Sequence, residues 1–395
     1  MTTTPTPARL HAVTREVEPG ADLLEAFAPG GFAWLHHQTR LVTSGTATRI
    51  GADDVATALA AVAVDDPLQL PGTGALAVGA LPFDPDARGE LVVPARIAGE
   101  LDGRAWITEI GPAPAGPRTV LGPPTRFSVV APRSRADWRA AVEEALGAIE
   151  RGDLEKVVLA REVLVEADTP FDASDIVRGL VAHQPGSFVY SSDGFVGASP
   201  ELLVRRAGAI VESRPVAGTT VADSDEALLA LAASVKDTRE HRYVVDGIVD
   251  ALSGLCTDLT VEAIPEVAVF GPVAHLATPI RGRLHAPAPS ALDLARLLHP
   301  TPAVGGTPRA VALDAIRTLE GFDRGRYAGP VGWVDARGDG EWGLALRCAQ
   351  IDPDDPALLR LFAGCGIVAD SQPAAELAES DAKLVPVRQA LAADG

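Results

Sequence analysis

The fold is decided by residues 187–206, which read SFVYSSDGFVGASPELLVRR. Two runs of β-branched and aromatic residues flank the dipeptide Asp193-Gly194, a sequence that favours the tight turn of a β-hairpin. A third strand is expected after Ala207-Gly208, and another β-rich segment extends from Lys156 to Val165. These segments predict antiparallel neighbours in a sheet.

Helical patterns occur outside these strands. Residues 137–151 form an apolar stripe that ends before Gly152, and the capping-box spacing of residues 223–226 begins a helical pattern to about residue 255. Residues 373–391 form another pattern, which Pro386 is expected to kink. The sequence has no 20–50-residue repeat and no Gly-x-Gly-x-x-Gly or Walker motif. An α+β fold therefore fits better than a nucleotide-binding α/β fold.

The 395 residues are 47% apolar, which is enough to bury a large core. Residues 1–9 are rich in Thr and Pro and are expected to form a disordered tail. Gly and Pro turns interrupt residues 10–124, and a Pro-rich stretch precedes the first strong helix. We therefore expect residues 10–124 to form an N-terminal subregion of the same fold as residues 125–395.

Charge and cysteine content exclude several classes. There are 53 acidic and 34 basic residues, and the net charge of −19 argues against a nucleic acid or an anionic membrane as partner. No N-terminal apolar run is long enough to span a bilayer, so we expect a cytoplasmic protein. The three cysteines have no metal-ligand spacing, and no partner helix is evident, so a monomer is expected.

Two helical patterns carry paired acids. Asp237 and Glu240 are three residues apart, as are Glu376 and Glu379, so each pair lies on one helix face. Four carboxylates could form an oxygen site for Mg²⁺. The alternative from spacing alone is two solvated faces, with Glu379 and Lys383 forming a surface ion pair.

Other candidates are equally ambiguous in isolation. Lys156 begins a β-rich segment and Glu201 follows Pro200 at a strand entry, where either side chain could face solvent. The Gly218-Thr219 end of residues 214–219 could bring backbone N–H groups close to an anion, or could form a plain turn.

The order and spacing of these motifs resemble the chorismate-binding family, which includes isochorismate, salicylate, anthranilate and aminodeoxychorismate synthases. The resemblance extends from about residue 135 to residue 387. Its landmarks are residues 156–161, 199–203, 214–219, 236–241, 275–278, 299–306, 327–332, 347–349, 363–368 and 376–383. It implies two large, mainly antiparallel sheets packed as a sandwich with helices outside, as in anthranilate synthase.

Three positions separate the family members. The water-using members have a lysine general base where this chain has Lys156, and aminodeoxychorismate synthases commonly have a lysine nucleophile where it has Ala217. Salicylate-forming relatives tend to have threonine at the position of Ala303. The resemblance therefore implies an isochorismate synthase, with a salicylate synthase and a catalytically inactive chorismate-binding subunit as alternatives. Whether the product feeds menaquinone or siderophore synthesis depends on neighbouring enzymes.

The resemblance also implies a mechanism. Glu240 and Glu379 would hold Mg²⁺, supported by Asp237 and Glu376, and the metal would bind the ring carboxylate of chorismate. Lys156 would deprotonate the attacking water, and Glu201, with a pKa raised by burial, would protonate the departing hydroxyl. The implied substrate-binding residues are Gly218, Thr219, His275, Ala303, Tyr327, Arg347, Gly364 and Lys383.

Two positions depart from the family pattern. Asp237 is shorter than the glutamate often found there, and Cys365 replaces the usual alanine between two glycines.

Overall fold

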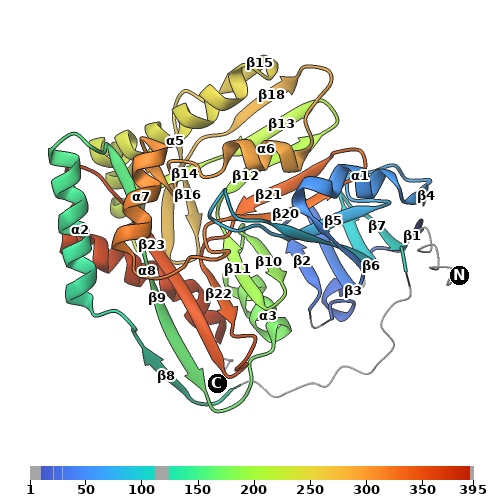
Figure 1. The fold of residues 1–395 in the computed structure, drawn as a ribbon, viewed down its shortest axis with the longest axis horizontal. Helices are drawn as coiled ribbons and strands as arrows, with labels where there is room; N and C mark the ends of the chain where they lie inside the picture. The colour runs from blue at the N-terminus through green and yellow to red at the C-terminus, as the bar shows by residue number, and fades with distance from the viewer. Residues whose placement is uncertain (1–9, 21, 29, 112–123, 392–395) are drawn as a thin grey trace, which may run out of the picture.

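The computed structural model describes residues 10–20, 22–28, 30–111 and 124–391 (Figure 1). The expected tail, residues 1–9, and most of the Pro-rich stretch before residue 125 lie outside the described residues. The tail and the boundary near residue 125 therefore stay predictions.

Two long strands, β3 (Thr39–Gly51) and β6 (Glu90–Leu101), pair with each other and join two arms of antiparallel strands. The first arm continues from β6 through β5 (Leu76–Ala80), β20 (Pro330–Asp335), β21 (Gly340–Leu344), β12 (Leu202–Ala207), β13 (Ile210–Arg214), β18 (Ile280–Leu284) and β15 (Cys256–Val261). The second continues from β3 through β2 (Phe32–Leu35), β10 (Phe188–Ser192), β11 (Phe195–Ser199), β22 (Cys348–Ile351), β23 (Leu358–Ile367) and β9 (Lys156–Ala167).

Shorter strands complete the sheets. On the far edge of β9 lie β19 (Gly306–Thr307) and β8 (Phe127–Val130), and next to β6 lie β7 (Arg104–Glu109), β1 (His11–Val17) and β4 (Ala63–Asp65). A separate three-stranded sheet contains β14 (Val216–Val221), β17 (Val273–Ala277) and β16 (Glu266–Phe270).

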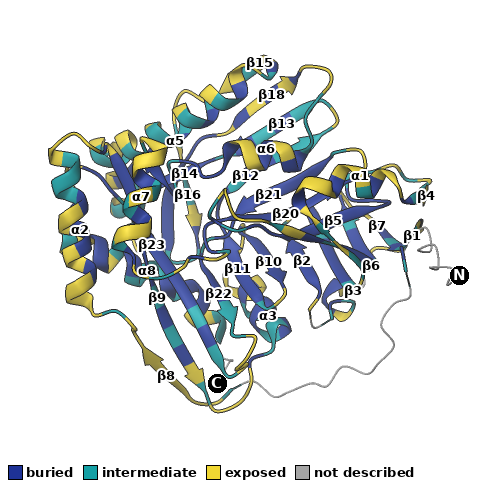
Figure 2. Cartoon of the chain, in the orientation of Figure 1, coloured by how far each residue is buried: buried dark blue, intermediate teal, exposed yellow. Residues whose placement is uncertain are grey.

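The main core lies between the two arms. Trp34 and Tyr190 of the second arm and Trp333 and Trp342 of the first are buried in one hydrophobic cluster. The helices lie outside: α3 (Ala173–His183) and α8 (Pro373–Leu391) bury a second cluster against the outer face of the second arm, and α6 (Ala291–Leu298) packs on the first. In Figure 2 the strands are mostly buried and the outer helix faces exposed. The predicted α+β class with mainly antiparallel sheets is confirmed.

Local predictions were correct in type and wrong in some boundaries. The helix predicted from residue 137 is α2 (Arg135–Glu150), whose N-cap Ser134 accepts a hydrogen bond from the Asp137 N–H. Residues 187–206 contain parts of three strands instead of two, because Pro200 and Glu201 interrupt the second run between β11 and β12. The helix predicted from the 223–226 capping box to residue 255 is two helices, α4 (Asp225–Ala233) and α5 (Val235–Ser253), because the Ser234 side chain caps a new N-terminus.

The remaining helices connect strands at the periphery. They are α1 (Val55–Ala60) and α7 (Arg309–Leu319), with the short 3-10 turns Leu23–Glu25 and Ala52–Asp54. Within the described ranges no helix is long and apolar enough to cross a membrane.

A buried carboxylate joins the N-terminal strands to the first arm. Glu341 of β21 accepts hydrogen bonds from the Trp34 indole N–H and the Thr39 hydroxyl, both at 2.8 Å. The same carboxylate lies 3.2 Å from Nε of Arg205 on β12. Residues far apart in the sequence therefore depend on one buried acceptor.

We expect Glu341→Leu to lower the free energy of unfolding by about 3 kcal/mol, because buried donors and a cation lose their acceptor. Urea denaturation measures the change. Glu90→Gln is the control, since Glu90 pairs with Arg49 on the surface and its loss should have little effect. Equal losses in the two variants would contradict the assigned role of Glu341.

Candidate active site

A pocket opens where β23, β14, β17 and the segment after β11 meet. Ten of the fourteen predicted site residues line it, namely Glu201, Gly218, Thr219, Glu240, His275, Ala303, Tyr327, Arg347, Gly364 and Lys383. Lys156, Asp237, Glu376 and Glu379 are not among its lining residues.

Glu201 is placed in the pocket wall by the Pro200 interruption between β11 and β12. Its side chain is buried, with 1% of the residue exposed, and neither carboxylate oxygen has a hydrogen-bond partner among the described residues. Burial raises the pKa of Glu201 to about 8, and Lys156 opposes the shift. Glu201 is therefore a carboxyl group that is protonated at neutral pH, in the direction expected from the sequence.

Arg347 is a buried cation whose hydrogen-bond partners are the Phe270 carbonyl and His275, with no carboxylate within ion-pair distance among the described residues. Burial lowers the pKa of Arg347 to about 9, so the guanidinium remains charged at neutral pH. A buried charge is costly unless it is paired, so this guanidinium is suited to receive an anionic group of a ligand.

His275 fixes the orientation of Arg347. Its Nδ1 lies 2.9 Å from the Gly218 carbonyl oxygen, so Nδ1–H donates there and Nε2 is left to accept from Nη2 of Arg347. Burial, followed by the charge of Arg347, lowers the pKa of His275 well below its usual value and keeps the ring neutral. Thr219 Oγ1 lies 3.2 Å from the same Nδ1.

Lys156 is completely buried behind the pocket wall, at the start of β9. Its Nζ lies 3.0 Å from Glu240 Oε1. Gly366 of β23 leaves space for this pair, because a Cβ at Gly366 would lie 2.2 Å from Glu240 Oε1 and 2.9 Å from Lys156 Cε. Burial alone would raise the pKa of Glu240, but the ammonium groups of Lys156, Lys383 and Lys236 lower it.

The other predicted metal ligands also have partners. Glu379 lies 2.7 Å from Lys383 and Glu376 lies 3.1 Å from Lys236, whereas Asp237 accepts a hydrogen bond from the Ser234 hydroxyl. Across the described part of the chain no three Asp, Glu, His or Cys side chains form a group that could hold a metal ion. The carboxylates of α5 and α8 nevertheless lie close enough to affect one another. Burial raises the pKa of Glu379, Lys383 opposes the shift, and the charges of Glu376 and Glu240 add to it.

Two glycines allow close approach of the backbone. Gly218 has φ of +72°, and a Cβ there would lie 2.8 Å from Cβ of Asp237. The Gly364 carbonyl accepts a hydrogen bond of 3.0 Å from Lys383 Nζ, and a Cβ at Gly364 would lie 3.1 Å from the Tyr327 hydroxyl.

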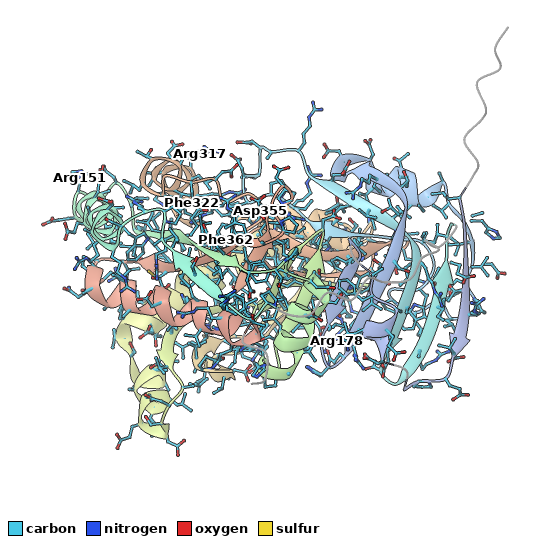
Figure 3. All side chains as sticks on the ribbon, turned by 90° about the horizontal axis from the view of Figure 1, so that it is seen from below. Arg151, Arg178, Arg317, Phe322, Asp355 and Phe362 are labelled. Atoms are coloured by element: carbon cyan, nitrogen blue, oxygen red, sulfur yellow. The ribbon has the colours of Figure 1, made fainter. Side chains whose placement is uncertain are left out.

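Phe362 is a wall residue that the sequence did not single out. Its ring stacks on Tyr327 with a centroid separation of 5.2 Å, and it is located toward the middle of the molecule, whereas Arg151 lies at the margin (Figure 3). Ala303 lies in the loop between α6 and β19. Phe362 directly precedes the 363–368 landmark, and this position beside the motif could have identified it as a pocket residue from the sequence.

Comparisons with known proteins identify the family and the fold of this chain. The family described as chorismate binding enzyme matches residues 122–392. A Mycobacterium tuberculosis protein provisionally named isochorismate synthase MenF is 42% identical over 342 residues, covering 81% of this chain and 87% of the relative.

Solved structures show the same fold. MenF, the menaquinone-specific isochorismate synthase from Escherichia coli, has a TM-score of 0.82 at 26% identity and covers 97% of this chain and 94% of its own. Anthranilate synthase component I from Streptococcus pneumoniae has a TM-score of 0.70 at 22% identity, covering 98% of this chain and 94% of its own, and shows the fold alone. With the family match extending over most of the sequence, the chain belongs to the chorismate binding enzyme family.

Proposed function

We propose that this protein is an isochorismate synthase, which converts chorismate reversibly to isochorismate with the help of Mg²⁺. The observation that carries the proposal is Glu201, a protonated carboxyl group without a hydrogen-bond partner in the described structure, in the same pocket as the unpaired Arg347. Such an arrangement suits the protonation of a hydroxyl leaving group on an anionic substrate. The relatives named isochorismate synthase support the same reaction.

Substrate binding uses the cations of the pocket. Arg347, oriented by His275, would bind one carboxylate of chorismate, and Lys383 would neutralise further negative charge. Tyr327 would donate its hydroxyl to the pyruvyl carboxylate, since burial keeps this phenol protonated by raising its pKa. Thr219 and the backbone of Gly218 and Gly364 would position the ring.

The chemical step is an allylic substitution. Lys156 would take a proton from a water molecule whose oxygen bonds to C2 of the ring, while the double bonds shift and the C4–O bond breaks. Glu201 would donate its proton to the leaving hydroxyl, so one water is consumed and one is released. Base action requires neutral Lys156, and therefore relief of its pairing with Glu240 in the complex.

The carboxylates fit Mg²⁺ in their chemistry, because four oxygen donors of α5 and α8 gather beside the pocket with only three lysine partners. Glu376 is buried, and Asp237, Glu240 and Glu379 are half-buried. Glu240 and Glu379 would hold the ion, with Asp237 and Glu376 in support. Two protein carboxylates suffice when water and substrate supply the other ligands. When bound, Mg²⁺ would supply charge neutralisation at the ring carboxylate of chorismate.

Incubation of the purified protein with chorismate, with Mg²⁺ or with EDTA, tests the proposal. We expect a mixture of chorismate and isochorismate with Mg²⁺, no pyruvate, and turnover that EDTA abolishes, because the substrate is a dianion. Chromatography and mass spectrometry identify the products. A Glu240→Gln variant should need more Mg²⁺ for the same rate.

Other products would change the assignment. Salicylate with pyruvate would indicate a salicylate synthase, and tight chorismate binding without turnover would indicate an inactive binding subunit. An unchanged Mg²⁺ requirement in Glu240→Gln would contradict the metal site.

We expect turnover of chorismate to decline as the pH rises through about 8, because the Glu201 carboxyl is protonated below its raised pKa and loses the proton above it. Glu201→Gln cannot donate a proton and should lower kcat by about 100-fold or more. The pH dependence of kcat/KM provides the measurement. A rate independent of pH between 7 and about 9 would argue against Glu201 as the acid.

In Gly366→Ala the added Cβ would collide with the Lys156–Glu240 pair and displace the proposed base. We therefore expect kcat to fall by about 100-fold. Gly254→Ala is the matched control, since a Cβ at Gly254 meets no atom within 4 Å and its φ is not in the left-handed region. Steady-state kinetics and thermal melting compare the two. Normal turnover in Gly366→Ala would show that the geometry of this pair is unimportant.

A further inference from the structure

The edge of β9 that faces away from β23 has an unusual set of hydrogen-bond partners. The Val158 N–H donates to the Gly305 carbonyl at 2.8 Å, where the pairing with β19 ends. The next two groups on this edge are bonded by side chains: the Val158 carbonyl accepts from Arg324 Nη2 at 3.0 Å, and the Ala160 N–H donates to Glu320 Oε1 at 2.7 Å. An ion pair thus takes the place of a neighbouring strand before β8 begins.

Glu320 and Arg324 are both buried, with 3% and 4% of each residue exposed. Arg324 Nε donates to Glu320 Oε2 at 2.8 Å, and Nη2 donates to Oε1 of the same carboxylate, so the pair is bidentate. Nη1 of Arg324 donates to the Val304 carbonyl at 2.8 Å. The guanidinium also lies 4.2 Å from the centre of the Phe83 ring.

Each segment held by this pair carries part of the pocket. Strand β9 begins with Lys156, two residues before Val158. Val304 lines the pocket beside Ala303. The Tyr327 N–H donates to the Arg324 carbonyl at 2.9 Å. Neither member of the ion pair lines the pocket, so both act on it through other residues.

Arginine is required by this geometry. One planar guanidinium donates to two carbonyls and to a carboxylate at fixed angles, which the single ammonium of lysine cannot do. Replacing one member alone would leave a buried charge unpaired, whereas replacing both by leucine would remove the charges and leave the Val158 and Ala160 backbone groups without partners.

We propose that Glu320 and Arg324 are positioning residues, which set the relative placement of the Lys156 strand, the Ala303 loop and Tyr327. The expected effect on kcat rests on the proposed function. The hydrogen bonding of the β9 edge by this pair can be tested by amide hydrogen exchange, which does not require an active enzyme.

The test compares Arg324→Lys and the double variant Glu320→Leu/Arg324→Leu with the wild type. We expect kcat to fall by about tenfold or more, the size expected for small displacements of catalytic groups, with KM changed by less than about threefold. The double variant contains no unpaired buried charge, so its fold should be retained while positioning is lost. Exchange of the Ala160 amide hydrogen, measured by NMR, should become faster, and that of Leu159, which lies opposite Cys365 of β23, should not.

Arg337→Lys is the matched control. Arg337 likewise joins a buried carboxylate, Asp335 at 2.6 Å, to backbone carbonyls including that of Thr73, but neither Arg337 nor Asp335 lines the pocket. It should lower the melting temperature without lowering kcat. Normal kcat in Arg324→Lys, an equal loss in Arg337→Lys, or unchanged Ala160 exchange would overturn the proposal. An inactive wild type would refute the proposed function alone, since the exchange measurement would still decide the hydrogen bonding of β9.

Discussion

Hydrogen bonding along both edges of β9 is the constraint on which the rest of the structure depends. One edge is bonded by β23 over ten residue pairs, from Val157–Ile367 to Glu166–Leu358. The other is divided among β19, the Glu320–Arg324 pair and β8. A buried backbone group without a partner costs about 1–3 kcal/mol, so any shift of β9 along β23 would be opposed at many positions together. The position of this strand therefore determines where Lys156, its first residue, lies.

The second constraint is electrostatic. A chain with a net charge of −19 can attract an anionic ligand only through positive charge that is placed locally in its pocket. Lys156, Lys236 and Lys383 each pair with a glutamate of α5 or α8, whereas Arg347 has no carboxylate partner among the described residues. The lysine–glutamate pairs keep the buried charges compensated, and Arg347 retains its full attraction for a ligand. The lysine–glutamate pairs thus leave little net charge beside the pocket, and the unpaired guanidinium is the cation suited to attract an anionic ligand.

Local sequence patterns predicted the strand and helix types well, because they depend on periodicity and turn residues. They failed at Ser234 and at Pro200-Glu201, where one capping side chain and one interruption divide elements that look continuous in the sequence. The interruption at Glu201 is also what aims its carboxyl group into the pocket. A break in a strand pattern next to an acid was therefore a usable signal.

The composition of the pocket was predictable for a different reason. Its residues lie in landmarks whose order resembles a known family, so ten of the fourteen predicted site residues line the pocket. The spacing of residues 376–383 did offer the Glu379–Lys383 pair. The sequence could not show that Lys156 lies behind the wall, or that Glu240 and Glu376 pair with lysines, because these two pairs join residues more than 80 positions apart. Nor could it reveal Glu320 and Arg324, whose role depends on where β19 ends.

In the proposed reversible reaction, the positions of the proposed acid and base have a further consequence. The same groups must exchange roles in the reverse direction, so Glu201 must be able to accept a proton as well as donate one. A carboxyl group with an ordinary pKa would be almost fully ionised at neutral pH and would favour only proton acceptance. Burial brings the pKa of Glu201 to about 8, close enough to neutral pH for both protonation states to be accessible. Burial without a nearby donor among the described residues keeps this pKa raised, because a donor directed at the carboxylate would stabilise the ionised form and lower the pKa again.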